Sequence, residues 1–144
     1  MDNAEIIRTW NENFANRNAD AFSDLFTEDF QTVATNLPAP LMAAQWIGFI
    51  KMLYAASSDL DFNWKLISDQ DNEIMMSYQL TGTHDGTLAA AAVKMKDWEA
   101  TGKSFSLPVD EYKLTITDGK ISRIDVDPAE GAGLGGMVAQ LELN

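Results

Sequence analysis

Hydrophobic and polar residues follow a helical period in the first third of the chain and an alternating period after it. Ile6, Trp10 and Phe14 recur every four residues, and this spacing predicts a helix over 2–18 with one apolar stripe. A shorter stripe directly after it predicts a second helix. Segment 41–57 is apolar around most of its circumference, so we expect a third helix that is buried on more than one side.

The rest of the chain mostly alternates between apolar and polar residues, which is the pattern of strands with one buried face. Within 74–84, for example, Tyr78 and His84 share the apolar face. Asp118 and Gly119 predict a two-residue hairpin turn. Helices followed by antiparallel strands indicate an α+β fold, with the helices on one face of a curved sheet. The predicted strands cover 29–35, 60–68, 74–84, 103–116 and 121–128.

Three segments have weaker patterns. The alanine-rich stretch 85–103 leaves three alternatives open, namely a short helix, a flap or a strand of small residues. The glycine-rich stretch 129–136 predicts a flexible link, and 137–143 predicts a short final helix. No repeat or linker divides the sequence, and 144 residues suit one domain, so we predict a single domain over 1–144.

The alternation slips by one residue within the strand predicted over 103–116. Phe105 is apolar at an odd position, whereas Tyr112 and Leu114 are apolar at even positions, and one face of a regular strand cannot collect both sets. A bulge near Pro108 would restore the match and place Asp110 on the apolar face, where a carboxylate needs a partner or a cavity. The alternative is a strand that begins after Pro108, with Asp110 at its solvated end.

His84, the single histidine, presents the same choice. It shares a face with Tyr78, so it points toward the core side of its strand. It either lines a pocket or is a histidine whose hydrogen bonds are satisfied at the rim of the sheet, beside the turn at Asp85 and Gly86.

Composition and charge exclude several functional classes. The net charge of −12 would repel a phosphate backbone, so we expect no nucleic-acid partner. The absence of cysteine excludes disulfides and thiol chemistry. With only one histidine as well, the chain offers few metal ligands, which argues against a metal site. The first residues lack the features of a signal peptide, and no segment approaches the roughly 20 apolar residues of a membrane span. We therefore expect a cytoplasmic protein with no membrane partner.

The order of several motifs resembles the SnoaL-like polyketide-cyclase-related proteins of the nuclear-transport-factor-2-like superfamily. The similarity runs along nearly the whole chain, and its order is more specific for the family than for one activity, because the fold hosts many functions. The matching stretches are FANRNADAFSDLFTEDF, LTGTHDG, ATGKSFSLPVDEYKL, DGKIS and MVAQLEL.

This resemblance implies a cone-shaped α+β barrel, in which N-terminal helices pack on a strongly curved, mostly antiparallel sheet around a deep apolar cavity. It also implies a homodimer formed through the sheets, and no metal or organic cofactor. In the family's cyclases an aspartate on the strand before the last hairpin is the general acid/base of an intramolecular aldol closure. That role falls to Asp110, or to Tyr112 under a different alignment, and the family's cavity histidine corresponds to His84.

An aspartate in an apolar cavity has a raised pKa and can remove a proton next to a carbonyl group. His84 or Tyr112 can then hydrogen-bond the enolate oxygen. We expect a cofactor-independent cyclase or isomerase acting on a small hydrophobic carbonyl compound; the alternative is a non-catalytic small-molecule-binding or interaction protein. The predicted cavity walls are Trp10, Phe14, Phe30, Phe49, Leu53, Trp64, Met76, Tyr78, Trp98 and Phe105.

Overall fold

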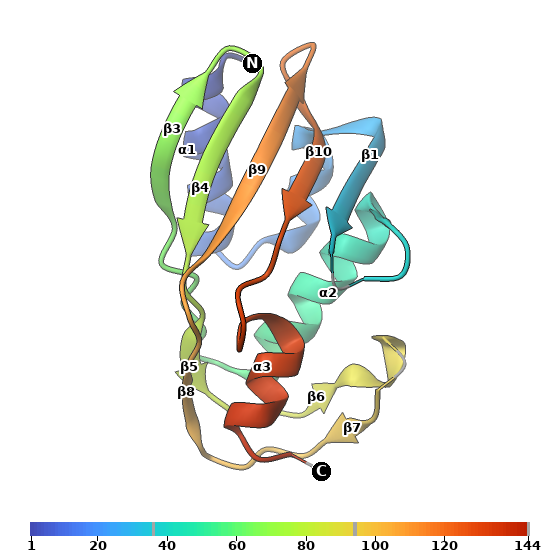
Figure 1. Ribbon diagram of the computed structural model, residues 1–144, viewed down its shortest axis with the longest axis vertical. Helices are drawn as coiled ribbons and strands as arrows, with labels where there is room; N and C mark the ends of the chain where they lie inside the picture. Colours follow the sequence, from blue (N-terminus) through green and yellow to red (C-terminus); the bar gives the residue numbers. More distant parts are fainter. Residues whose placement is uncertain (36, 94, 144) are drawn as a thin grey trace.

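The computed structural model describes residues 1–35, 37–93 and 95–143 of the chain (Figure 1). The first and last helices lie toward opposite ends of its long axis. The helices are α1 (Asn3–Ala15), η1 (Ala19–Leu25, 3-10), α2 (Ala43–Ala56), η2 (Ala90–Val93, 3-10) and α3 (Gly133–Gln140). The strands are β1 (Phe26–Ala34), β2 (Leu41–Met42), β3 (Lys65–Gln70), β4 (Glu73–Tyr78), β5 (Thr81–Thr83), β6 (Leu88–Ala89), β7 (Asp97–Trp98), β8 (Ser104–Ser106), β9 (Asp110–Thr117) and β10 (Lys120–Val126).

The main sheet has six strands in the order β2-β1-β10-β9-β4-β3. Only β1 and β10 pair in parallel, and the other neighbours are antiparallel. Asp118 and Gly119 have φ angles of 51° and 76° and form the predicted tight turn between β9 and β10. The pairing register shifts between β1 and β10, between β9 and β10 and between β3 and β4, and such bulges bend a sheet.

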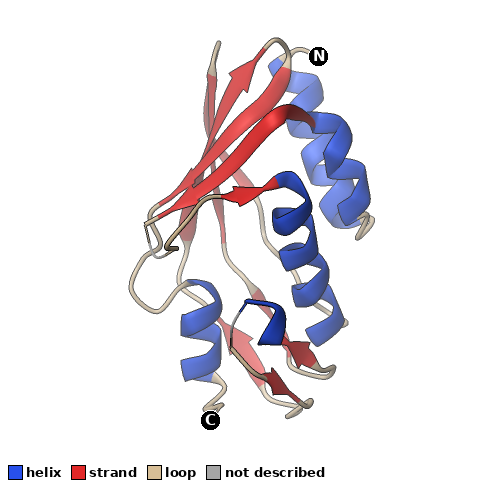
Figure 2. Ribbon diagram, turned by 90° about the vertical axis from the view of Figure 1, so that its right-hand side faces the viewer, coloured by secondary structure: helices blue, strands red, loops and turns tan. Residues whose placement is uncertain are grey.

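Helices α1 and α2 cover one face of this sheet (Figure 2). Asp2 begins α1 by accepting a 2.8 Å hydrogen bond from the Glu5 backbone N–H. The small pairs β5–β8 and β6–β7 lie near the end of the molecule that holds α3 (Figures 1 and 2). Helices α1 and α2, together with the end of the molecule that holds α3, β5–β8 and β6–β7, therefore border the inner face of the main sheet.

Aromatic side chains fill much of the space between the helices and the sheet. Trp10 of α1 is fully buried, and its ring centroid lies 5.1 Å from Phe22, 5.7 Å from Trp46 and 5.2 Å from Trp64. Tilted and edge-on arrangements such as these add to the stabilisation that burial provides. This part of the interior is a packed core.

The structure confirms the predicted α+β class, with N-terminal helices on a curved, mostly antiparallel sheet. The alternation predicted over 74–84 is confirmed in β4, where Ile74 and Tyr78 are buried, but the single strand predicted there is interrupted after Tyr78, and β5 belongs to a separate pair with β8. The alternative that the strand begins after Pro108 is correct in its boundary, because β8 ends at Ser106 and β9 begins at Asp110. It is wrong that Asp110 lies at a solvated end, because Asp110 is only 5% exposed.

The prediction for segment 60–68 is partly wrong. Its strand begins only at Lys65, because Asn63 adopts a left-handed conformation with a φ angle of 51° that interrupts the extended backbone. Beyond Asn63 the side chains of β3 no longer continue the alternation that buries Phe62. Leu66 is consequently 51% exposed instead of sharing the buried face.

The remaining segments also differ in detail from their predictions. The second helix is a 3-10 helix that gives way directly to β1 at Phe26. Within 85–103, β6 and β7 pair around η2, while Lys94 lies outside the described residues. The helix predicted over 137–143 begins earlier, at Gly133, and the predicted flexible link is correspondingly shorter.

Candidate functional site

A cavity of about 260 Å³ lies where β1, β4, β9 and β10 approach α2 and α3. Exposed Leu37 and Met95 belong to its wall and mark its opening to solvent. A smaller hollow of about 30 Å³ adjoins it and shares Phe49, Tyr78 and Leu134 with it. The described residues that line the larger cavity are Thr32, Ala34, Leu37, Leu41, Trp46, Phe49, Tyr78, Met95, Tyr112, Val126, Pro128, Gly133, Leu134 and Gly135.

The cavity wall is apolar apart from a few neutral polar groups. These are the hydroxyl groups of Thr32, Tyr78 and Tyr112 and the indole N–H of Trp46. None of the described lining residues carries a charged side chain. Such a hollow suits an uncharged, largely apolar molecule that has a small number of oxygen atoms.

Asp110 lies beside this cavity, at the point where the chain restarts as β9. It pairs with Tyr78 of β4, and its side chain is only 5% exposed. Its Oδ1 accepts a 2.9 Å hydrogen bond from the Glu111 backbone N–H, and its Oδ2 accepts one of 3.3 Å from the Tyr78 hydroxyl. Asp110 is not among the described lining residues of this cavity and instead lines a hollow of about 370 Å³ that shares Val126 with it. Its hydrogen bond to Tyr78 is therefore what links the carboxylate to the cavity.

Burial raises the pKa of Asp110 above its ordinary value. The hydrogen bonds from Glu111 and Tyr78 and the backbone of Ala129 oppose this shift, whereas the negative charge of Asp127 adds to it. The carboxyl group is therefore poised closer to neutral pH than a surface aspartate, which suits a group that takes up and returns protons.

The two cavity tyrosines keep their protons. Burial raises the pKa of Tyr112 to about 12, and it raises the pKa of Tyr78 still further, with Tyr112 and Asp110 adding to the rise. The Trp46 N–H lies close enough to Tyr112 to oppose this rise of its pKa, but it forms no hydrogen bond of ordinary length and direction. Both phenols therefore remain hydrogen-bond donors at neutral pH.

His84 lies elsewhere, beyond the end of β5. It is fully buried, its Nδ1 is 3.0 Å from the Thr101 hydroxyl, and its backbone carbonyl accepts hydrogen bonds from Thr101 and Gly102. Burial lowers its pKa, against the opposing influence of the Trp98 backbone and Asp85. His84 is not among the described residues that line the cavity.

The structure therefore separates the three candidate catalytic residues. Tyr112 lines the cavity, Asp110 is one side chain away from it, and His84 holds the 101–103 segment against the end of β5. The position of His84 corresponds to the alternative of a histidine at the rim of the sheet, but its hydrogen bonds are only partly satisfied, because its buried Nε2 has no partner among the described residues.

The predicted wall residues also divide into groups. Phe49 and Tyr78 line the cavity, and Leu53 lines the smaller hollow beside it. Phe14 and Trp64 line a separate surface hollow of about 430 Å³ beside Arg17. The other predicted wall residues lie outside the lining described for these hollows, in the core or half-buried, namely Trp10, Phe30, Met76, Trp98 and Phe105.

Sequence reasoning missed several functional candidates in the wall. Trp46 belongs to a helix that is apolar on all sides, so its spacing does not reveal which face meets a hollow. Thr32 lies in the short strand 29–35 and is a polar residue at a buried position, 3% exposed. A buried threonine on the inner face was the one signal that could have identified it.

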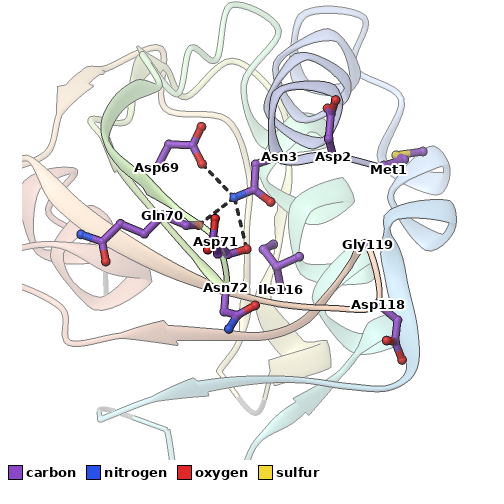
Figure 3. A pocket seen from close by; sticks show the side chains of 10 residues that line it. All are labelled: Met1, Asp2, Asn3, Asp69, Gln70, Asp71, Asn72, Ile116, Asp118 and Gly119. Carbon is purple, nitrogen blue, oxygen red and sulfur yellow. Dashed lines mark hydrogen bonds between the residues drawn. The ribbon is translucent and has the colours of Figure 1, made fainter.

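A second, larger hollow of about 500 Å³ is open and polar (Figure 3). The Asn3 side chain donates hydrogen bonds of 2.8 Å to Asp69 Oδ1 and 2.7 Å to the Gln70 carbonyl. These bonds fasten the start of α1 to the turn between β3 and β4. Asp2 and Asp118 also lie along its edge, but the described residues contain no group of three or more acidic or histidine side chains arranged to hold a metal ion.

Comparison with known proteins identifies the fold. The family model of the SnoaL-like domain matches residues 7–124. No curated protein matches the chain in sequence. Within the described part of the chain, no helix combines the length and apolarity that a membrane crossing requires.

Solved structures share the architecture at low sequence identity. A proposed polyketide cyclase from Pseudomonas putida is 19% identical, with a TM-score of 0.69 over 97% of this chain and 98% of that one. AclR, a proposed hydroxylase from Streptomyces galilaeus, is 15% identical, with a TM-score of 0.70 over 96% and 82%. A protein from Catenulispora acidiphila with a ketosteroid isomerase-like fold, solved with trimethylamine, is 16% identical, with a TM-score of 0.66 over 97% and 94%. At these identities the similarity establishes the fold and leaves the activity to the residues of the site.

Proposed function

Because this chain belongs to the SnoaL-like domain family, we propose that its interior cavity binds a small hydrophobic carbonyl compound. The proposed activity is that of a cofactor-independent cyclase or isomerase, with Asp110 as general base. One observation supports it above the others: a buried carboxyl group is hydrogen-bonded to Tyr78, whose side chain lines the cavity.

The proposed reaction begins with proton transfer. A substrate carbon next to the carbonyl reaches Asp110 at the cavity edge, beside the Tyr78 hydroxyl, and Asp110 takes its proton. The C–H electrons form the enolate, and the negative charge develops on oxygen. The Tyr112 hydroxyl, which keeps its proton because the pKa of Tyr112 is about 12, donates a hydrogen bond to that oxygen. In an isomerase the proton returns at another carbon. In a cyclase the enolate carbon attacks a second carbonyl group and the new alkoxide takes up the proton.

Tyr78 has a positioning role in this scheme. Its hydroxyl holds Asp110 Oδ2 at the edge of the cavity and favours the ionised carboxylate that a base requires. The apolar wall keeps water away, so that the donors act in a medium of low polarity.

The proposal can be tested without knowledge of the natural substrate. β-Tetralone, a bicyclic ketone with acidic α-protons, is incubated with the protein in D₂O, and NMR follows the loss of the α-proton signals across a range of pH. We expect the wild-type protein to accelerate exchange and Asp110→Asn to reduce that acceleration by roughly 10²- to 10⁴-fold.

Asp20→Asn is a matched control, because it makes the same chemical change at an exposed position of η1, where Asp20 is paired with Lys51 and lines none of the hollows described here. It should leave the exchange rate unchanged. Binding of β-tetralone without faster exchange in the wild type would reject the enzymatic proposal in favour of a non-catalytic small-molecule-binding protein.

A further inference from the structure

Two polar atoms in the cavity wall have no hydrogen-bond partner among the described residues. One is the Thr32 hydroxyl oxygen, on β1, and the other is the Trp46 indole nitrogen, in the first turn of α2. The side chains of Thr32 and Trp46 are 3% and 1% exposed, so bulk water does not satisfy them either.

Buried polar groups in folded proteins are nearly always hydrogen-bonded, and each exception calls for an explanation. Two further indole nitrogens, those of Trp10 and Trp64, are also without partners, but they lie outside the described lining of this cavity. Thr32 and Trp46 differ from them because they line the same hollow. A group bound in the hollow can therefore supply the partner that the protein does not.

The chemistry of the two atoms defines what they can bind. The indole N–H only donates a hydrogen bond, and the threonine hydroxyl can donate or accept one. An oxygen atom that accepts hydrogen bonds satisfies both. Since none of the described lining residues is charged and Asp110 lies close by, a neutral oxygen fits this wall better than a carboxylate.

We propose that Thr32 and Trp46 form an oxygen-binding subsite, which selects neutral carbonyl compounds and orients them in the cavity. The inference names the substrate class of the site and rests on the proposed function only for the chemical steps after binding. Trp46 and Tyr112 both line this cavity, so a carbonyl oxygen held by Trp46 can face the Tyr112 hydroxyl. The carbon next to that carbonyl can then face Tyr78 and Asp110.

A matched pair of ligands tests the subsite. β-Tetralone and the hydrocarbon tetralin have nearly the same shape and differ in the carbonyl oxygen. Their dissociation constants are measured by competition in ligand-observed NMR, which needs no signal from tryptophan. We expect the wild-type protein to prefer the ketone by about tenfold or more, because its oxygen satisfies buried donors that the hydrocarbon leaves unpaired.

Three variants assign the preference to the two side chains. Trp46→Phe removes the N–H and keeps an aromatic ring, while Thr32→Val removes the hydroxyl and keeps the shape. Each should weaken the binding of β-tetralone by about fivefold to tenfold and leave tetralin unchanged. Thr32→Ser keeps a hydroxyl and should retain the preference. Thr115→Val makes the Thr32 change at a half-buried position on β9, outside the cavity lining, and should alter neither constant.

The outcomes separate this inference from the proposed function. Equal affinity for the two compounds in the wild type, as expected if a water molecule occupies the subsite, overturns the inference, and so does the absence of binding. A ketone preference that survives both Trp46→Phe and Thr32→Val also overturns it, even where exchange remains dependent on Asp110. A preference lost in those variants supports the subsite, even where the wild-type protein catalyses no exchange and the proposed function fails.

Discussion

Asp110 and His84 are both buried ionisable residues, but they lie in regions of opposite character. Around Asp110, at the start of β9, a neighbouring hydroxyl connects the carboxylate to a hollow interior. Around His84, beyond the end of β5, the neighbours are a threonine hydroxyl and backbone groups of the 101–103 segment. Burial alone therefore does not identify a functional group; the deciding feature is whether its partners end at a space that a ligand can occupy.

The same contrast extends through the interior. Trp10 and its aromatic neighbours lie at centroid separations near 5 Å, for example 5.1 Å to Phe22, and fill the space they enclose. The region between β1, α2 and α3 is lined by aromatic residues too, but it leaves about 260 Å³ unfilled. The molecule thus combines a solid core that fixes the sheet with a hollow that is free to bind.

The largest effect on ligand binding is expected from filling the hollow. Leu134→Trp projects a larger ring from α3 into the cavity that Leu134 lines. Binding of β-tetralone should weaken roughly a hundredfold, because the ligand loses the apolar surface it would bury. Calorimetry measures the affinity. Leu66→Trp, on exposed β3, makes the same change outside the cavity and should have no effect; normal binding by Leu134→Trp would place the ligand elsewhere.

A smaller effect is expected from the link between carboxylate and cavity. Tyr78→Phe removes the hydroxyl that donates to Asp110, and that hydrogen bond lowers the pKa of Asp110. Its loss should raise this pKa, shift the acidic limb of the pH–rate profile toward higher pH and reduce exchange roughly tenfold near neutral pH. Tyr54→Phe is the control, since its hydroxyl donates to the Phe14 carbonyl. An unshifted limb in Tyr78→Phe would separate Asp110 from the reaction.

The smallest effect is expected on the other side of the comparison. Burial lowers the pKa of His84 in the folded protein, so the unfolded chain binds the proton more readily. The contribution of His84 is thus complete above the ordinary histidine pKa of 6.5 and is lost as the pH falls below it. Urea unfolding between about pH 7.5 and about pH 5.5 should show a shallower loss of stability in His84→Gln than in the wild type.

Asp110 titrates with the opposite sign, because its pKa is raised in the folded protein. Its contribution is present in both proteins, and the difference between them isolates His84. Identical pH dependence in the wild type and His84→Gln would show that this histidine is not held neutral by the fold.

Much of the fold was predictable because local patterns agree with it. The four-residue spacing of Ile6, Trp10 and Phe14 gave α1, and the alternation after Ile74 gave the buried face of β4. The slip between odd and even positions marked the break before β9 and drew attention to Asp110. In each case the period of the backbone fixes the face on which a side chain lies.

The cavity was harder to predict because a hollow is a property of several elements together. Aromatic residues on buried faces have the same pattern whether they fill a core, as Trp10 does, or line a space, as Phe49 does. The contribution of α3 depends on Gly133, which has a φ angle of 71° and begins the helix within a glycine-rich stretch. The space that stays open depends on where α3 is held, and its Gln140 side chain is hydrogen-bonded to Ser106 of β8.

The proposed role of Asp110 is tested most directly by comparing Asp110→Asn and His84→Gln in the same exchange assay. The initial rate of α-proton loss from β-tetralone is measured for both variants and the wild type at one pH. We predict that Asp110→Asn loses roughly 10²- to 10⁴-fold of the acceleration, while His84→Gln stays within about twofold of the wild type. An Asp110→Asn variant that exchanges at the wild-type rate, or a His84→Gln variant equally impaired, would contradict this assignment.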